Sequence, residues 1–271
     1  MATVFQGTTS HPRSEPSGPN DTAVQIHWWR TTGNNIAIES VVSGGRGRTV
    51  ANWPTSIGTA VNSAFFPLQA DGSNPVVNAF SINGGRQVLP NSDWMNGSEN
   101  WEDARNGTPL DFIMDPINRT SNALLVFGTG GAFGNDGILN RVNGQRLHMS
   151  DIRWGIGGMD LDMANTSLNS SEGFRNGFRW RHVHAGRTDL RSNRVAIGYT
   201  GAVGSVPQYI VAVFRDCQIF DVRSWLRSKG VTNFGLLLDG GASAQARNRA
   251  GNQSQTILSS TRNVPVVLSM S

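Results

Sequence analysis

Two apolar segments of the chain each end in a polar residue that is followed by a pair of glycines. In sequence order these residues are Asn83, Gly84, Gly85 and Arg86 in "VVNAFSINGGR", and Asp239, Gly240, Gly241 and Ser243 in "FGLLLDGGAS". Glycine lets a ligand approach the backbone closely, and strand ends are where open sheets gather their binding groups. Two loops of the same design, one with an amide and one with an acid, predict a shared site.

Each glycine pair has a simpler interpretation when it is taken alone. Either loop fits a tight turn. Asp239 also fits a structural acid that caps the short segment after Gly241 by accepting backbone N–H bonds.

A third polar stretch is "RWRHVHAGRTD", residues 179–189. If it is a strand, His182 and His184 share one face, and Arg187 and Asp189 follow closely. A metal site needs a third ligand that this pattern does not supply, so no metal site is predicted. The stretch fits a solvated histidine pair or a face for an anion.

Other motifs fail on their spacing or their residue types. "FGTGGAFGNDG" lacks the third glycine of a dinucleotide loop, and "DLDMAN" has Ala164 where a calcium loop needs a ligand. Cys217 is the single cysteine, which excludes an intrachain disulfide and a thiolate metal cluster.

Composition and charge narrow the class of partner. The net charge of +4 is carried by scattered arginines, with Lys229 as the sole lysine, so no nucleic-acid partner is predicted. No apolar run approaches the roughly 18 residues of a membrane span. The first twenty residues lack a basic start followed by an apolar stretch, so no export signal is predicted. The compartment and the oligomeric state stay open.

Short apolar segments bounded by Gly, Asn, Pro and Ser predict a strand-rich protein. The predicted elements are a hairpin of 23–29 with 35–42, a second hairpin of 194–199 with 208–214, and further strands at 75–82, 109–114 and 122–127. "IFDVRSWLRSKG" predicts an amphipathic helix with Asp221 as N-cap, Trp225 and Leu226 buried, and an end at Gly230. "VTNFGLLLD" then predicts a strand that is covered on both faces.

These elements predict an α+β fold with a mixed, strand-rich sheet and few helices. Residues 23–271 form a single domain in this interpretation, and residues 1–22, rich in Ser, Thr, Pro and Gly, form a flexible N-terminal segment.

The order of the blocks resembles the phosphodiester glycosidase family, the domain of the uncovering enzyme, N-acetylglucosamine-1-phosphodiester alpha-N-acetylglucosaminidase. The blocks are "AFSINGG", "RVAIGYTGAVGSVPQYIVAVF", the amphipathic helix, "GLLLDGGASA" and "TRNVPVVLSM", and they cover roughly residues 75–271. Three positions depart from the family pattern: Arg86 stands in place of aromatics, Val195 in place of Thr, and Ala242 in place of a third Gly. Residues 87–190 match no block.

The resemblance implies a hydrolase that cleaves a sugar from a phosphodiester at the glycosidic C–O bond. Its substrate would be a small molecule or glycan carrying the phosphodiester, with no cofactor, and a phosphate monoester would leave. Asp239 would act as nucleophile or as base for water, and Arg194 would contact the phosphate in a bidentate manner. Asn83 and Ser243 would hydrogen-bond sugar hydroxyls or phosphate oxygens.

The remaining site residues would bind the substrate. Arg86 and Arg187 would assist at the phosphate, His184 would face it, and the glycines at positions 84, 85, 240 and 241 would let the ring approach the backbone. The second acid of the usual glycosidase pair is not identified; Asp189 and Glu172 are the candidates.

Three alternatives remain open. The chain fits a binding protein that holds a phosphorylated sugar or a nucleotide-derived ligand without turnover. It also fits a phosphodiesterase that cleaves P–O. A divalent cation stays open as a cofactor, because Asp239 and backbone carbonyls are also ligands for such an ion.

Overall fold

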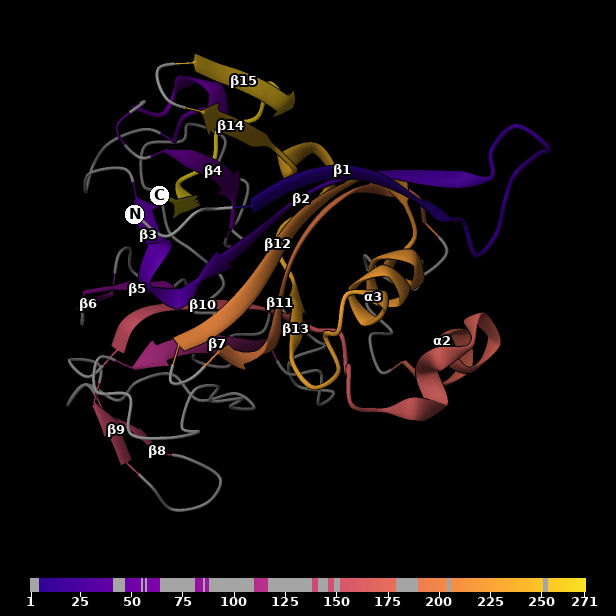
Figure 1. The fold of residues 1–271 in the computed structure, drawn as a ribbon, viewed down its shortest axis with the longest axis horizontal. Helices are drawn as coiled ribbons and strands as arrows, with labels where there is room; N and C mark the ends of the chain where they lie inside the picture. The colour runs from indigo at the N-terminus through magenta and orange to yellow at the C-terminus, as the bar shows by residue number, and fades with distance from the viewer. Residues whose placement is uncertain are drawn as a thin grey trace, which may run out of the picture.

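The computed structural model of the chain is mostly β (Figure 1). It describes residues 5–40, 47–54, 56, 58–63, 81–84, 86–87, 110–116, 138–140, 146–148, 152–178, 190–203, 206–250 and 253–271. Within these residues every strand pair is antiparallel, and two α-helices are present. The prediction of an α+β fold with a mixed sheet is therefore wrong, because antiparallel ladders dominate and the helices are few and short.

Nine strands form the large sheet. In spatial order they are β1 (Phe5–Pro12), β2 (Ala23–Thr32), β12 (Val206–Cys217), β11 (Ser192–Val203), β13 (Gly235–Leu237), β10 (Ile152–Asp160), β5 (Ser81–Asn83) and β6 (Arg86–Gln87), with β7 (Leu110–Pro116) also paired to β10. The predicted hairpin of 194–199 with 208–214 is confirmed as β11 and β12, which pair Tyr199 with Tyr209. The predicted strand at 109–114 is confirmed as β7.

Five strands form the small sheet, and two more form a separate ladder. The small sheet has the order β15 (Gln253–Leu258), β14 (Ala246–Ala250), β4 (Thr59–Asn62), β16 (Val266–Met270) and β3 (Ile36–Ser40); the ladder joins β8 (Ile138–Asn140) to β9 (Arg146–His148). The predicted hairpin of 23–29 with 35–42 is wrong, because β2 and β3 belong to different sheets. The chain turns between them through the short 3₁₀ helix η1 (Gly33–Asn35).

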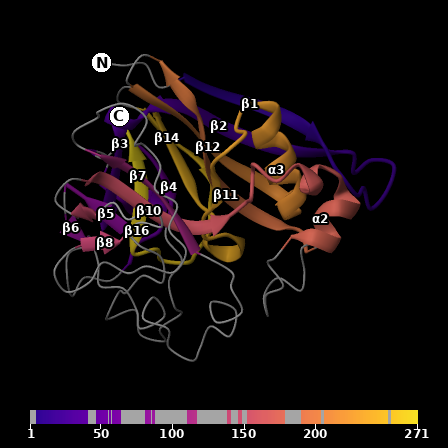
Figure 2. The same cartoon turned by 90° about the horizontal axis from the view of Figure 1, so that it is seen from below.

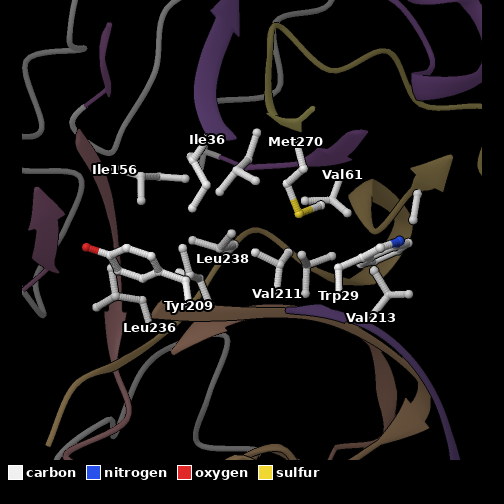
Figure 3. Close-up of a cluster of buried hydrophobic side chains, with 14 of the residues drawn as sticks. Trp29, Ile36, Val61, Ile156, Tyr209, Val211, Val213, Leu236, Leu238 and Met270 are labelled. Carbon is white, nitrogen blue, oxygen red and sulfur yellow. The ribbon is translucent and has the colours of Figure 1, made fainter. Parts of the chain in front are cut away.

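The main hydrophobic core lies between the two sheets. Figure 3 shows side chains from the small sheet, among them Val61 and Met270, facing Val211 of the large sheet and Leu238, the residue that follows β13. On β12 the alternate side chains of Tyr209, Val211 and Val213 enter this core, and their neighbours on the strand point to the opposite face. The large sheet is therefore covered on both faces.

The helices cover that opposite face (Figure 2). α3 (Ile219–Ser228) buries Trp225 and Leu226 as predicted, and its start differs by three residues: Gln218 is the N-cap, and Asp221 completes a capping box by accepting the Gln218 N–H at 3.0 Å. The predicted two-sided burial of the segment ending at Asp239 is also confirmed, because Leu236 and Leu238 enter the core between the sheets and Leu237 packs on the helix side.

A buried arginine fastens α3 to the segment that follows β10. Arg223 has no exposed surface, and its guanidinium donates to backbone oxygens and one side chain within residues 161–169. These acceptors are Leu161 O at 3.0 Å, Leu168 O at 2.7 Å, Asn169 Oδ1 at 2.9 Å, Asp162 O at 3.0 Å and Asn165 O at 2.7 Å. The segment leads through η6 (Thr166–Asn169) into α2 (Ser171–Gly177), so the Arg223 side chain holds the connection between β10 and α2 against α3.

The N-terminal segment has regular structure over part of its length. Residues 1–22 were expected to be flexible, whereas Phe5–Pro12 form β1 and pair with β2 through all eight residues. Asp21 then joins Arg13 and Arg191 in ion pairs. The expectation fails here because β2, the next strand along the chain, pairs with this segment, and a local excess of Ser, Pro and Gly does not reveal such pairing. No helix in the described ranges is long and apolar enough to cross a membrane.

Candidate functional site

Asp239 lies where the chain leaves the large sheet for the small one. β13 ends at Leu237, and the next strand, β14, belongs to the small sheet. The Asp239 N–H donates to Ser63 O at 3.2 Å, and the Asn62 side chain donates to Asp239 O at 2.7 Å. Both partners come from the end of β4, so the backbone of Asp239 is held from the small sheet.

The Asp239 carboxyl is crowded by protein, although the residue keeps some solvent exposure. Its Oδ1 accepts the Gly240 N–H at 2.9 Å, and Ser243 also hydrogen-bonds to it. Burial raises the pKa of Asp239 to about 7, against the lowering effects of Ser243, Gly240, Arg262 and Arg194. A carboxyl with such a pKa is partly protonated at neutral pH, as is typical of acid–base groups in active sites.

Arg194, a residue near the start of β11, is the first guanidinium beside Asp239. Its Nη2 donates to Leu190 O at 3.0 Å, and its buried Nε has no hydrogen-bond partner among the residues that the structure describes. Burial lowers the pKa of Arg194, and the charge of Asp239 raises it. A buried N–H without a protein acceptor is the group that a ligand oxygen would satisfy.

Arg262 is a second guanidinium at this site, and it is not among the residues predicted from the sequence. It lies between β15 and β16 and donates from Nη1 to Ser243 Oγ at 3.1 Å. The "TRNVPVVLSM" block contains this arginine, so its place in the family resemblance was the available signal. Its loop setting gives no local sign of its contact with Ser243 or of the effect of its charge on Asp239.

The two glycines after Asp239 are needed for the local geometry. A Cβ on Gly240 would lie 3.0 Å from Asn193 O and 3.4 Å from Arg194 Cδ, and Gly241 has a φ of +61°. Gly241 opens η7 (Gly241–Ser243), whose N-cap, Gly240, makes no side-chain capping bond. Asp239 lies one residue before this N-cap and accepts the backbone N–H of Gly240, as the alternative of a structural acid required, but no bond from its side chain to a backbone N–H of η7 is present among the described residues.

The other glycine-paired loop lies at a different point along β10. β10 pairs Trp154 with Asn83 and Met159 with Leu237, so the ends of β5 and β13 are five β10 residues apart, roughly 17 Å at the rise of a strand. The structure records no contact between Asn83 and Asp239 in the part of the chain that it describes. The amide that does contact Asp239 is Asn62.

The remaining predicted residues are not brought to Asp239. Gly84 is exposed, with a φ of +56°, and its N–H donates to Arg153 O at 2.7 Å. The backbone of Arg86 pairs with Asn83. Glu172, a candidate second acid, is exposed in the first turn of α2.

Several predicted residues lie outside the described part of the chain. They are Gly85, His182, His184, Arg187 and Asp189, together with the predicted strand at 122–127. In the residues that are described, no group of three or more His, Cys, Asp or Glu side chains could hold a metal ion.

Comparisons with known proteins show a distant fold relationship. No protein-family model matches the chain, and no curated protein matches its sequence. Among solved structures, the catalytic domain of zebrafish N-acetylglucosamine-1-phosphodiester alpha-N-acetylglucosaminidase, auto-inhibited by its pro-peptide, is similar with 14% identity and a TM-score of 0.57, over 98% of this chain and 83% of that one. At this identity the likeness shows the fold alone.

Two further solved structures are also similar. A hypothetical protein from Synechocystis matches with 13% identity and a TM-score of 0.42, over 99% of this chain and 64% of that one. A putative exported protein from Burkholderia pseudomallei matches with 11% identity and a TM-score of 0.46, over 95% of this chain and 75% of that one.

Proposed function

We propose that the protein is a hydrolase that cleaves the glycosidic C–O bond of a sugar linked through a phosphodiester. The observation that carries the proposal is a crowded carboxyl, Asp239, with a pKa of about 7, acted on by the guanidinium groups of Arg194 and Arg262. The fold likeness to an N-acetylglucosamine-1-phosphodiester alpha-N-acetylglucosaminidase is consistent with it.

The proposed reaction uses Asp239 at the anomeric carbon. As nucleophile its carboxylate forms a glycosyl ester that water then hydrolyses; as base it takes a proton from the water that attacks the carbon directly. In either case the bonding electrons of the C–O bond leave with the phosphate oxygen, and a phosphate monoester is released. Both roles require the ionised carboxylate.

Arg194 is proposed to stabilise the departing phosphate. A phosphate monoester is a better leaving group than an alcohol, so a fixed positive charge can replace much of the general acid. Among the described residues nothing accepts from the Nε of Arg194, which leaves this N–H for a phosphate oxygen. Among the described residues the charges that act on Asp239 are both positive, with no second carboxylate among them. This arrangement suits a leaving group that needs little protonation.

The same arrangement also suits the alternative of a binding protein for a phosphorylated sugar, because two guanidinium groups bind an anion whether or not it reacts. Incubation with N-acetylglucosamine 1-phosphate methyl diester separates the two. The hydrolase releases free sugar and methyl phosphate, whereas the binding protein yields affinity without product. In ¹⁸O-labelled water the label enters the sugar if the C–O bond is cleaved and the phosphate if the P–O bond is cleaved. Label in the phosphate would contradict the proposal.

The rate of hydrolysis is expected to depend on pH through Asp239. Since the reactive form is ionised and the pKa is about 7, kcat/KM should rise as the pH increases toward 7 and level off above it. Initial rates between pH 5 and pH 9 measure this profile. A rate that instead falls as the pH rises through 7 would assign Asp239 the role of an acid and contradict its role as nucleophile or base.

Gly240→Ala tests how closely Arg194 must lie to the loop. The added methyl lies 3.0 Å from Asn193 O, so the backbone just before Arg194 must give by a few tenths of an ångström, whereas the 3.4 Å to Arg194 Cδ is an ordinary contact. We expect kcat/KM to fall by about 10–100-fold, because small displacements of positioned groups are costly in catalysis. Steady-state kinetics and thermal unfolding measure this. Gly18→Ala, where an added Cβ meets nothing within 4 Å, is the control and should leave both unchanged.

A further inference from the structure

Arg262 is held at three points, which fixes the direction of its side chain. Its backbone N–H donates to Ser260 Oγ at 3.0 Å, its carbonyl accepts from Gln245 Nε2 at 2.6 Å, and its Nη1 donates to Ser243 Oγ at 3.1 Å. Ser260 also donates to Ala242 O. The segment of Arg262 and the segment of Ser243 are therefore tied together by both backbone and side-chain bonds.

The hydroxyl of Ser243 connects Arg262 to Asp239. A serine hydroxyl has one proton to donate and can accept, whereas a guanidinium only donates. With Arg262 donating to Ser243 Oγ, the serine proton is left for the carboxyl of Asp239, its other partner. Ser243 has no exposed surface, so bulk water does not compete for this hydroxyl. The bonds run in one direction, from Arg262 through Ser243 to the carboxylate.

We propose that Arg262 is a positioning residue that acts through Ser243 to orient and stabilise the ionised Asp239 carboxylate. The proposal rests on the function proposed above, in which that carboxylate does the chemistry. Arg262 therefore has a different part from Arg194: Arg194 has a free N–H for the substrate, and the bond from Arg262 is directed at the acid. The glycine-paired loops and their spacing in the sequence did not predict this role for Arg262.

The surroundings of Asp239 set the size and sign of the expected effect. The groups that face it are Gly240 N–H and Ser243 from the loop, Arg194 from β11, and Arg262 from the segment between β15 and β16; Cys217 of β12 in turn faces Arg194. Burial is the one influence that raises the pKa of Asp239, and the other four lower it. Removal of Arg262 takes away its positive charge and the donor that leaves the Ser243 proton for Asp239, so the pKa of Asp239 must rise.

The test is the titration of Asp239 without substrate. The carboxyl ¹³C resonances of [4-¹³C]aspartate-labelled protein are followed between pH 4 and pH 10, and the Asp239 resonance is assigned from its absence in Asp239→Asn. We expect the midpoint to rise by about one pH unit in Arg262→Met, the effect of losing an opposite charge and its hydrogen bond. In Arg262→Lys, which keeps the charge, the midpoint should return part of the way to the wild-type value.

The matched control is Arg215→Met, which removes an exposed arginine that donates to Ile257 O. It should leave the midpoint in place. Ser243→Ala removes the connecting hydroxyl and should also raise the midpoint, which keeps the proposal testable if Arg262→Met does not fold. An unchanged midpoint in Arg262→Met or Ser243→Ala, or an equal rise in Arg215→Met, would overturn the proposal.

The titration tests the role of Arg262, and the turnover assay tests the hydrolase function, so either proposal can be wrong without the other. If the midpoint rises as expected but no sugar phosphodiester is cleaved, Arg262 orients Asp239 and the proposed hydrolase function is wrong. If turnover occurs and the midpoint does not move, the hydrolase stands and Arg262 has no positioning role. When both succeed, the rising part of the kcat/KM profile should move to higher pH in Arg262→Met by the same interval as the titration.

Discussion

Asp239→Asn is expected to lower kcat on a sugar phosphodiester by about 10²–10⁴-fold, because an amide can neither attack the anomeric carbon nor take a proton from water. KM should change less, since the arginines that would hold the phosphate remain. Steady-state kinetics measure both constants. Glu39→Gln, which neutralises a carboxylate in β3, is the control and should retain wild-type turnover. A kcat within a few fold of wild type in Asp239→Asn would remove Asp239 from the reaction.

The same substitution should stabilise the protein in a pH-dependent way. The pKa of Asp239 is about 7 in the folded protein and its ordinary value is 3.8, so the folded state holds this proton over a range in which the unfolded chain has lost it. Wild-type stability therefore falls as the pH rises from about 4 to 7, and Asn removes this loss. At pH 8 we expect Asp239→Asn to unfold with a free energy about 3–4 kcal/mol higher than wild type, since each of the roughly three pKa units corresponds to about 1.4 kcal/mol. At pH 4 the difference should vanish.

Arg223→Met is expected to cost about 3–5 kcal/mol of unfolding free energy, the largest stability loss predicted here. The methionine fills much of the volume, but it leaves the backbone oxygens of residues 161–169 without their donors, and buried acceptors without partners are costly. Chemical denaturation measures the loss, and a fall in the melting temperature of roughly 6–12 °C should accompany it.

Arg227→Met is the matched control, since Arg227 lies one turn later on α3 and donates to a single acceptor, Met163 O. Its cost should stay near 1 kcal/mol. Equal losses in the two variants would show that Arg223 contributes no more than an ordinary helix-surface arginine. Arg223→Lys should recover part of the stability, because an ammonium group can serve some of the acceptors.

Local patterns predicted the β11–β12 hairpin and the α3 helix, but not β1, although its partner β2 lies close in the sequence. The β11–β12 hairpin joins segments separated by a short glycine-rich turn, and the α3 helix follows from the spacing of Val222, Trp225 and Leu226. The burial of the residues before Asp239 also follows from composition alone, because apolar side chains on both parities need cover on both faces.

Partners that lie far apart in the sequence were beyond this kind of pattern. β2 and β3 look like a hairpin because a turn separates them, yet β3 pairs with β16, more than 200 residues later. The chain passes from one sheet to the other through η1, and tertiary packing rather than local propensity decides which sheet each strand joins. The predicted α+β fold with a mixed sheet was wrong for the same reason, because the relative direction of two paired strands depends on the long connections between them.

The candidate site divides in the same manner. Asp239 and Arg194 were found because each stands at an end of a recognisable strand. Asn62 and Arg262 were missed because a polar residue at the end of a short strand or in a loop has no distinctive neighbours, and their contacts with the Asp239 loop form only after the two sheets pack. Asn83, which the repeated glycine design had linked to Asp239, instead pairs with β10 at Trp154.

The passage of the chain from one sheet to the other at Asp239 has a consequence for how the protein tolerates change. Arg194 is carried by the large sheet and Arg262 by a segment of the small one, so the gap between the two guanidinium groups is set by the thickness of the layer of side chains between the sheets. Val61, Leu238 and Met270 then act as spacers for the proposed site, although their own side chains are not among the proposed site residues. Substitutions that change the volume of these core residues would therefore alter the fit of the proposed anionic ligand at changes smaller than those needed to unfold the protein.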